Sequence, residues 1–155
     1  MKVRGTVVSG VLRGSIFIEI IHPRLVGMLG FHPYKGTLNV KLERPIDIRL
    51  HATKKVEHIL TDGTHNIDAY LAPVTLTFKD KDISCWAMRQ ARGVYGNDIL
   101  EIVYHESLKD TLSMQDGDDV VVTFDSLKKT GQKFKIPGAG LLKRLYGREA
   151  QVMKS

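Results

Sequence analysis

Thr37 and Asn39 are the first residues of this sequence that could do chemistry together. They follow Gly36 in a segment where polar and apolar residues alternate, so a strand would direct them to one face and Leu38 and Val40 to the other. Their hydroxyl and amide oxygens would then lie about 7 Å apart, within reach of one hard cation or its waters. Neutral oxygens suit Mg²⁺ when substrate phosphates balance most of its charge. An ordinary amphipathic strand with a solvated face would show the same alternation.

Glu101 is a second candidate, because it is the carboxylate in the otherwise apolar run 99–103. A glutamate between leucine and isoleucine most often faces solvent. If it were partly buried instead, its pKa would rise toward a value that suits a general base. Burial of this side chain would therefore decide between a surface residue and a catalytic one.

Two glycine-containing connections could contact phosphates. Residues 10–14 have glycine at both ends, so backbone amides there could approach a phosphate closely, although a plain hairpin turn has the same composition. In the loop 89–98, Arg89 and Arg92 could clamp phosphates, and Tyr95 could stack on a planar ring. A solvated connection is an equally good interpretation of this second loop.

The length and composition predict one globular domain. The chain has 155 residues, 43% of them hydrophobic and 26% charged, which is enough for a proper core. We find no signal-peptide core and no apolar run long enough to cross a bilayer, so we expect a cytoplasmic protein. Cys85 is the single cysteine, which excludes an intramolecular disulfide.

The net charge of +6 is concentrated toward the C-terminus. Residues 126–155 contain eight basic residues and one acidic residue, so residues 1–125 carry a net charge of −1. A dedicated nucleic-acid-binding domain is therefore less attractive. We expect a barrel domain over 1–125 and a basic extension over 126–155, which forms a packed or mobile amphipathic helix and could contact RNA or a membrane surface.

Most of the remaining pattern is typical of β-strands. The segments that we expect as strands are 3–9, 15–21, 37–42, 66–78, 83–88, 99–103 and 120–124. Short helices are expected over 22–30, with Pro23 at the first helical position, and over 106–112. Residues 51–66 are predicted as a polar connection. The fold class is all-β, a small barrel of about six strands with short helices.

The stretch 30–39 resembles the signature of a known enzyme family. The archaeal CTP-dependent riboflavin kinases carry G-F-x-P-Y-x-G-T-L-N, and this chain has Gly30-Phe31-His32-Pro33-Tyr34-Lys35-Gly36-Thr37-Leu38-Asn39. The resemblance extends over residues 3–124, where the run 99–103 and Asp116-Gly117-Asp118 fit the family in order and spacing. It implies a six-stranded cradle-loop barrel, and the basic C-terminal extension lies outside it.

The resemblance also implies an activity and a site. The activity is transfer of the γ-phosphoryl group of CTP to the primary hydroxyl of riboflavin, giving FMN and CDP, with Mg²⁺ held by Thr37 and Asn39. Glu101 would orient or deprotonate the hydroxyl, and the acceptor would contact Gly93 and Glu101. The residues that would hold the nucleotide are Gly10, Val11, Leu12, Arg13, Gly14, Ser15 and Ile16, followed by Glu106, Ser107, Leu108 and Lys109.

Departures from the family pattern leave two alternatives open. Leu12 and Arg13 replace a glycine and a glutamate of the nucleotide loop, and Gly93 and Tyr95 replace a threonine and a histidine near the acceptor. One alternative is a CTP-dependent kinase of a different small alcohol. The other is a non-catalytic barrel that binds a ligand, or RNA through the basic extension. For the kinase we expect a monomer whose partners are a nucleotide and a small alcohol.

Overall fold

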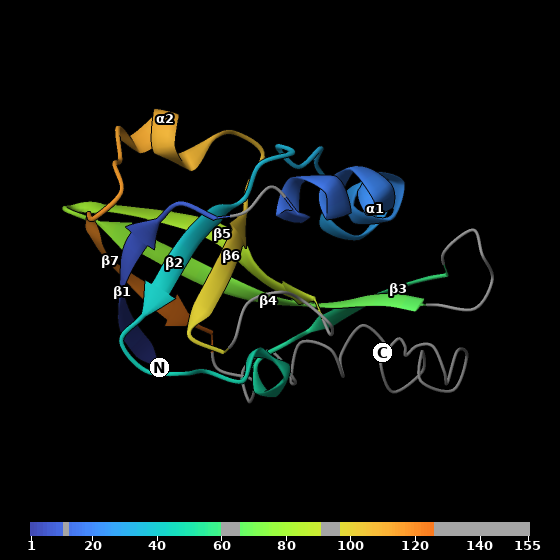
Figure 1. Ribbon diagram of the computed structural model, residues 1–155, viewed down its shortest axis with the longest axis horizontal. Helices are drawn as coiled ribbons and strands as arrows, with labels where there is room; N and C mark the ends of the chain where they lie inside the picture. The colour runs from blue at the N-terminus through green and yellow to red at the C-terminus, as the bar shows by residue number, and fades with distance from the viewer. Residues whose placement is uncertain (11–12, 60–65, 91–96, 126–155) are drawn as a thin grey trace.

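The computed structural model describes residues 1–10, 13–59, 66–90 and 97–125, which form seven strands and three short or medium helices. In chain order the elements are β1 (Lys2–Val8), α1 (Arg13–Leu29), β2 (Leu38–Leu42), the 3-10 helix η1 (Ile48–Leu50), β3 (Lys54–Ile59), β4 (Asn66–Phe78), β5 (Lys81–Gln90), β6 (Ile99–Val103), α2 (Leu108–Leu112) and β7 (Asp119–Phe124). Figure 1 shows their arrangement.

The strands form one antiparallel sheet that closes on itself. Its order is β3-β4-β5-β6-β2-β1-β7, and β7 pairs back onto β4. The closed ring therefore runs β4-β5-β6-β2-β1-β7, and β3 extends the sheet beyond the ring by pairing with the first part of β4. This confirms the all-β barrel expected from the sequence, with six strands in the closed ring.

Strand β4 changes partner within its own length. Its residues 66–71 pair with β3 on one edge, and residues 74–77 pair with β7 on that same side of the ring, while β5 runs along the other edge. Pro73 lies in the gap between the two partners. Because proline has no N–H to donate, a central strand tolerates it only where a ladder hydrogen bond is not required. The gap is such a place.

The interior of the barrel is an apolar cluster to which all strands of the ring contribute. The small helices close its ends (Figure 1): α2 adds Leu108 and Leu112 at one end, and η1 adds Ile48 at the other. The alternation of each strand sends every second side chain into this cluster and the intervening ones to the outer face. Functional side chains can therefore lie on the outer face without disturbing the apolar core.

Helix α1 covers part of the outer face (Figure 1). It packs there through a second apolar cluster, which joins Ile18, Ile21 and Leu25 of the helix to Val56, Ala69, Leu71, Met88 and Val103 of the sheet. The helical members are spaced by three and four residues, so they form one face of the helix. Their complete burial shows that this face is what docks α1.

Helix α1 corrects three predictions. The expected turn over 10–14 and strand over 15–21 are wrong, because the chain is helical from Arg13. The predicted short helix ends where expected, at Leu29 before Gly30 with its positive φ of 80°, but Pro23 lies inside the helix and not at its start. Proline there leaves the carbonyl of Glu19 without its usual intrahelical donor. Because Glu19 is exposed, water can reach that part of the helix.

The other predicted elements have mixed outcomes. The strands over 3–9, 37–42, 66–78, 83–88, 99–103 and 120–124 are confirmed as β1, β2, β4, β5, β6 and β7, and the helix over 106–112 as α2. The polar connection predicted for 51–66 is wrong in part, since it contains β3. The extension 126–155 lies outside the described residues.

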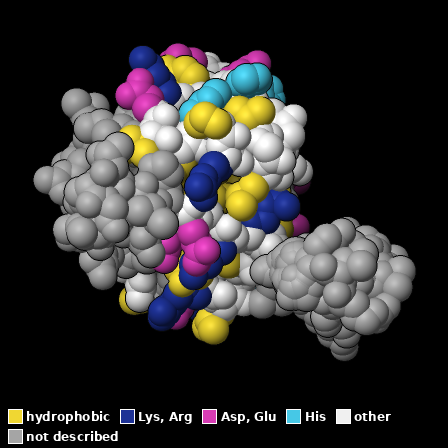
Figure 2. Space-filling view, turned by 90° about the vertical axis from the view of Figure 1, so that its right-hand side faces the viewer, with side chains coloured by type: hydrophobic (Ala, Val, Ile, Leu, Met, Phe, Trp, Pro, Cys, Tyr) yellow, Lys and Arg dark blue, Asp and Glu magenta, His cyan; other side chains and the backbone are white. Residues whose placement is uncertain are grey.

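The surface that carries α1 mixes charges of both signs (Figure 2). Basic and acidic side chains are interspersed over its described part, and histidine side chains gather at one edge.

In the described part of the chain, no helix is both long and apolar enough to cross a bilayer.

Replacement of Gly5 tests how tightly the barrel is packed. A Cβ at this buried position of β1 would clash with the Val40 side chain and lie 3.0 Å from the carbonyl oxygen of Lys41. We expect Gly5→Ala to lower the free energy of unfolding by about 1–3 kcal/mol, measured by urea denaturation. Gly27→Ala is the matched control, because nothing lies within 4 Å of that Cβ on α1. It should raise stability by about 0.5–1 kcal/mol, and equal midpoints for the two variants would contradict the packing argument.

Candidate active site

Strand β2 lies between β1 and β6 and brings Asn39 beside Glu101. Asn39 is opposite Val8 on one side and opposite Glu101 on the other, and directly opposed residues of a sheet point to the same face. The inward positions 38, 40 and 42 are buried in the barrel, as the alternation predicts. Asn39 is on the outer face, yet its side chain is buried there as well, at 8% exposure.

Glu101 forms a hydrogen bond with Thr37, the other residue of the predicted metal pair. The Thr37 hydroxyl donates to Glu101 Oε1 over 3.2 Å, across strands 64 residues apart in sequence. Glu101 is only 5% exposed. The structure therefore brings Thr37, Asn39 and Glu101 together at the start of β2 and on the neighbouring strand β6, as a site built from these three residues requires.

The buried position changes the acidity of Glu101. Burial raises the pKa of its carboxyl above the ordinary value of 4.5, while the hydrogen bond from Thr37 and the positive charge of Arg89 act in the opposite direction. Desolvation is the largest effect, so the net change is upward. A carboxyl group with a raised pKa is a better proton acceptor than an exposed one.

The amide oxygen of Asn39 is an unusual feature of this site. Asn39 Oδ1 is buried and accepts no hydrogen bond from the described residues. A buried acceptor without a partner is destabilising by about 1–3 kcal/mol, unless a ligand fills the role. Hard cations such as Mg²⁺ prefer oxygen ligands of this kind, so Asn39 and the neighbouring Thr37 hydroxyl fit such an ion. Among the described residues no group of three or more His, Cys, Asp or Glu could hold a metal instead.

The first predicted nucleotide segment differs from the expected open loop. Gly10 is exposed just after β1, and the chain is already helical at Arg13, so positions 13–16 form the first turn of α1. Val11 and Leu12 lie outside the described residues. The segment that could wrap a phosphate is thus shorter than the sequence suggested.

The second predicted nucleotide segment is the start of α2. The Ser107 hydroxyl caps this helix by accepting a hydrogen bond from the Asp110 amide over 3.3 Å. Leu108 is buried in the barrel core, so its side chain is not available to a ligand. Glu106 is exposed and Lys109 is half-exposed, so both side chains remain reachable.

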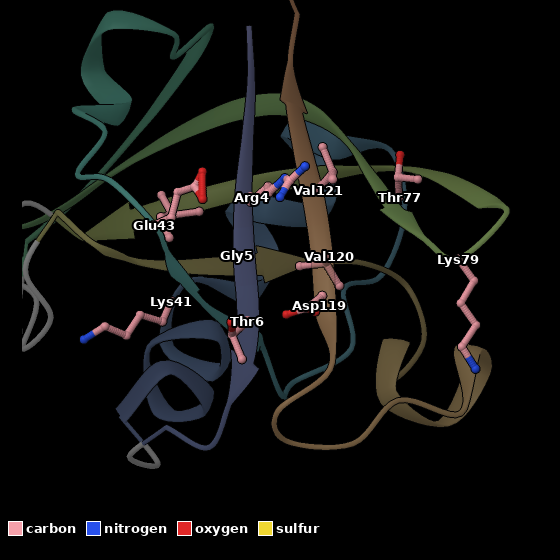
Figure 3. A pocket seen from close by; sticks show the side chains of 11 residues that line it. Arg4, Gly5, Thr6, Lys41, Glu43, Thr77, Lys79, Asp119, Val120 and Val121 are labelled. Atoms are coloured by element: carbon pink, nitrogen blue, oxygen red, sulfur yellow. The ribbon is translucent and has the colours of Figure 1, made fainter.

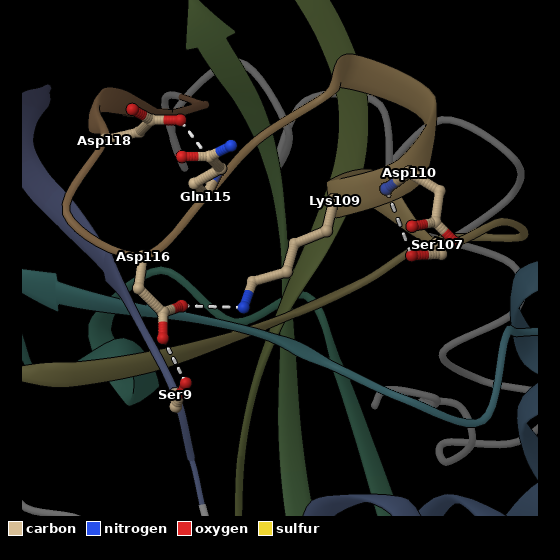
Figure 4. A network of polar contacts seen from close by, with 7 residues as sticks. All are labelled: Ser9, Ser107, Lys109, Asp110, Gln115, Asp116 and Asp118. Atoms are coloured by element: carbon tan, nitrogen blue, oxygen red, sulfur yellow. Dashed lines mark hydrogen bonds and ion pairs between the residues drawn. The ribbon is translucent and has the colours of Figure 1, made fainter.

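A contact that the sequence did not predict joins these two segments. Asp116, in the turn after α2, accepts from Lys109 Nζ over 2.7 Å and from the Ser9 hydroxyl (Figure 4). Ser9 directly precedes Gly10, so the two predicted nucleotide segments meet at this carboxylate. One indication that Asp116 matters was present in the sequence, because Asp116-Gly117-Asp118 fits the family in order and spacing.

A separate hollow of about 650 Å³ lies over β1 (Figure 3). Its lining includes Arg4, Thr6, Lys41, Thr77 and Asp119, and none of the predicted site residues. The chemistry suggested by Thr37, Asn39 and Glu101 therefore does not involve this hollow.

Comparison with known proteins gives the family. The sequence model of the family CTP-dep_RFKase, described as "Domain of unknown function DUF120", matches residues 7–124. The chain belongs to this CTP-dependent riboflavin kinase family. The match covers the barrel from the end of β1 to β7, and it confirms the resemblance noted in the sequence.

Relatives of this riboflavin kinase family member are named riboflavin kinase, a phosphotransferase that acts on an alcohol group. The protein of Methanosphaera stadtmanae is 31% identical over 81% of this chain and 98% of its own length. The protein of Methanococcus vannielii is 30% identical over 83% of this chain and 100% of its own length. The protein of Pyrobaculum islandicum is 30% identical, and this chain spans 59% of it.

Part of the acceptor site predicted from the resemblance is not described in this chain. Gly93, together with Arg92 and Tyr95, lies outside the described residues. Arg89, predicted in the same loop, is instead in β5 and partly buried. Burial lowers the pKa of the Arg89 guanidinium, and the negative charges of Asp47, Glu101 and Asp98 act in the opposite direction.

Replacing Glu101 in this family member tests the cost of burying the carboxylate. Between pH 4.5 and the raised pKa the folded state binds a proton that the unfolded state has released, so wild-type stability falls as the pH rises through this window. Glu101→Gln keeps an acceptor for Thr37 but cannot ionise. We expect it to be the more stable protein at pH 8, with the difference shrinking below pH 4.5, measured by urea denaturation at both pH values.

Glu43→Gln, at an exposed position after β2, controls for the loss of one negative charge. A Glu101→Gln protein less stable than wild type at pH 8 would show that the ionised carboxylate is well compensated.

Proposed function

We propose that this chain is a riboflavin kinase that transfers the γ-phosphoryl group of CTP to the primary hydroxyl of riboflavin, giving FMN and CDP. The observation that carries the proposal is the buried Asn39 Oδ1, which has no hydrogen-bond partner among the described residues and lies beside the hydrogen bond between Thr37 and Glu101. Membership of the family and the names of the relatives support the same activity.

Glu101 acts on the acceptor in this proposal. Its buried carboxylate accepts a hydrogen bond from the attacking hydroxyl and takes up the proton as the oxygen bonds to phosphorus. The pKa raised by burial suits this role. Thr37 fixes one carboxylate oxygen, Oε1, and so leaves the other to receive the hydroxyl.

Thr37 and Asn39 would hold Mg²⁺ through their neutral oxygens. When bound, the ion neutralises negative charge on the transferring phosphates. Asn39 lies on a strand that is paired on both sides, so its position is set by the sheet. Thr37 directly precedes this strand and is held by its hydrogen bond to Glu101. Asn39 Oδ1 accepts no hydrogen bond from the described part of the chain, and it would be satisfied by the ion or by one of its waters.

The nucleotide lies, in this proposal, between the segment that starts at Gly10 and the start of α2. Lys109 supplies a positive charge for the phosphates, and the exposed Glu106 can accept hydrogen bonds from the ribose or the base. Phosphoryl transfer depends chiefly on alignment and charge neutralisation, so a site with few functional side chains is sufficient.

The direct test is product formation. Purified protein with Mg²⁺ and riboflavin should form FMN with CTP and much less with ATP, as followed by chromatography. If no FMN forms but CDP is released when other alcohols are supplied, the acceptor is one of those alcohols and not riboflavin. A protein with no nucleotide turnover under any of these conditions would contradict the proposal.

Asn39→Ala is the variant control for this assay, because it removes the buried oxygen. We expect it to lower kcat/KM by about 100-fold. Wild-type activity in this variant would show that Asn39 does not hold the metal.

A second test uses the hydrogen bond between Thr37 and Glu101. As the pH falls through the pKa of Glu101, the base becomes protonated and kcat/KM declines. Thr37→Val removes a donor that lowers this pKa, so the acid limb of the profile should move to higher pH. Thr75→Val, a half-buried threonine of β4, is the matched control and should leave the profile in place. If the acid limb of the Thr37→Val profile does not move, the group that titrates there is not Glu101.

A further inference from the structure

The turn between α2 and β7 is held firmly against the end of β1. The Gly117 amide donates to the carbonyl oxygen of Val7 over 2.8 Å, and the Val7 amide donates to the carbonyl oxygen of Asp118 over 2.9 Å. The Asp118 carboxylate closes the turn by accepting from the Gln115 amide over 2.8 Å. Gly117 supplies the positive φ of 97° that the turn needs. The backbone that carries Asp116 is therefore fixed relative to β1.

The Asp116 side chain bridges two elements that are far apart in sequence. One carboxylate oxygen, Oδ1, accepts from Lys109 Nζ over 2.7 Å, and the other, Oδ2, accepts from the Ser9 hydroxyl, 107 residues away (Figure 4). These contacts hold the pKa of Asp116 below its ordinary value, so the carboxylate is charged at neutral pH. Both carboxylate oxygens are used.

The two bridged residues border the proposed nucleotide site. Val8, the residue before Ser9, is opposite Asn39 in the sheet, which places Ser9 and Gly10 at the Thr37 end of β2. Lys109 lies on α2, whose Leu108 and Leu112 are anchored in the barrel core. Asp116 thus stands between the segment that precedes α1 and the helix that carries the cation.

The fold itself has little need of this bridge. The side chains of Lys109 and Asp116 are 40% and 49% exposed, and exposed ion pairs contribute little to stability. A bridge that orients a lysine is more valuable when a charged ligand covers it, because exclusion of water strengthens the interaction. The bridge between Lys109 and Asp116 therefore has more to contribute when a charged ligand is bound than when the site is empty.

We propose that Asp116 is a positioning residue of the nucleotide site, which aims the Lys109 ammonium at the nucleotide phosphates and fixes Ser9 at the start of the segment that covers them. The inference rests on the proposed function. Asp116 does not touch the nucleotide itself, and it acts through Lys109 and Ser9.

The test compares nucleotide binding with turnover in Asp116→Ala. Titration calorimetry with CTP and Mg²⁺, without riboflavin, should give a Kd about fivefold higher than in wild type. In steady-state assays KM for CTP should rise by a similar factor, while kcat and KM for riboflavin stay within about twofold. Ser9→Ala, which removes one of the two contacts, should give a smaller rise in Kd, of about twofold.

A double-mutant cycle separates positioning from a merely structural effect. Because Asp116 acts through Lys109, the combined Asp116→Ala and Lys109→Ala protein should bind CTP more tightly than the product of the two single effects predicts. Asp125→Ala, an exposed carboxylate after the far end of β7, is the matched control and should bind as wild type does. Thermal midpoints of all variants should agree within about 2 °C.

The outcomes distinguish this inference from the proposed function. A wild-type protein that does not bind CTP would overturn both. Wild-type binding with an unchanged or lower Kd in Asp116→Ala would overturn the positioning role alone, and a lower Kd would show that the carboxylate competes with phosphate for Lys109. If the Kd of the double variant equals the product of the two single effects, Asp116 and Lys109 act independently, and the positioning role is also overturned.

Discussion

The register of β2 between β1 and β6 is the constraint on which the rest of the site depends. Leu38, Val40 and Leu42 face the barrel core, and a shift by one residue would place Asn39 in that core and expose the leucines. Core packing therefore fixes which side chains reach the outer face. The contact between Thr37 and Glu101 is a consequence of packing on the opposite side of the same strands.

Much of the barrel could be predicted from its alternation, but α1 could not. The run 15–21 is rich in isoleucine, a residue typical of strands, and a short apolar run does not distinguish a strand from a buried helix. The helix is decided by tertiary contacts of Ile18, Ile21 and Leu25 with the sheet. Strand β3 was missed for the opposite reason, because the sequence pattern there is polar and Val56 is the one described side chain of this strand in that apolar cluster.

The residue types of the site could be predicted, but their environment could not. Alternation placed Thr37 and Asn39 on one face, Glu101 was the carboxylate in an otherwise apolar run, and the family resemblance suggested a role for each. The burial of Glu101 depends on which strands are neighbours and on how α1 closes the outer face beside Met88 and Val103. Neither property is written in the local sequence, and the helix responsible was itself predicted as a strand. Asp116 was missed because its partners lie in two distant segments.

The site combines two features that disfavour folding. One is the desolvated carboxyl group of Glu101, and the other is the buried Asn39 oxygen, which has no partner among the residues that the structure describes. Apolar residues at both positions would suit the sheet better, so the polar side chains are explained more readily by a ligand than by the fold. A closed barrel tolerates them because its separate core supplies the stability. The same closure prevents the strands from moving apart, which keeps the two oxygens and the carboxylate in place before any substrate arrives. For a reaction that depends on alignment, that rigidity is itself a contribution to catalysis.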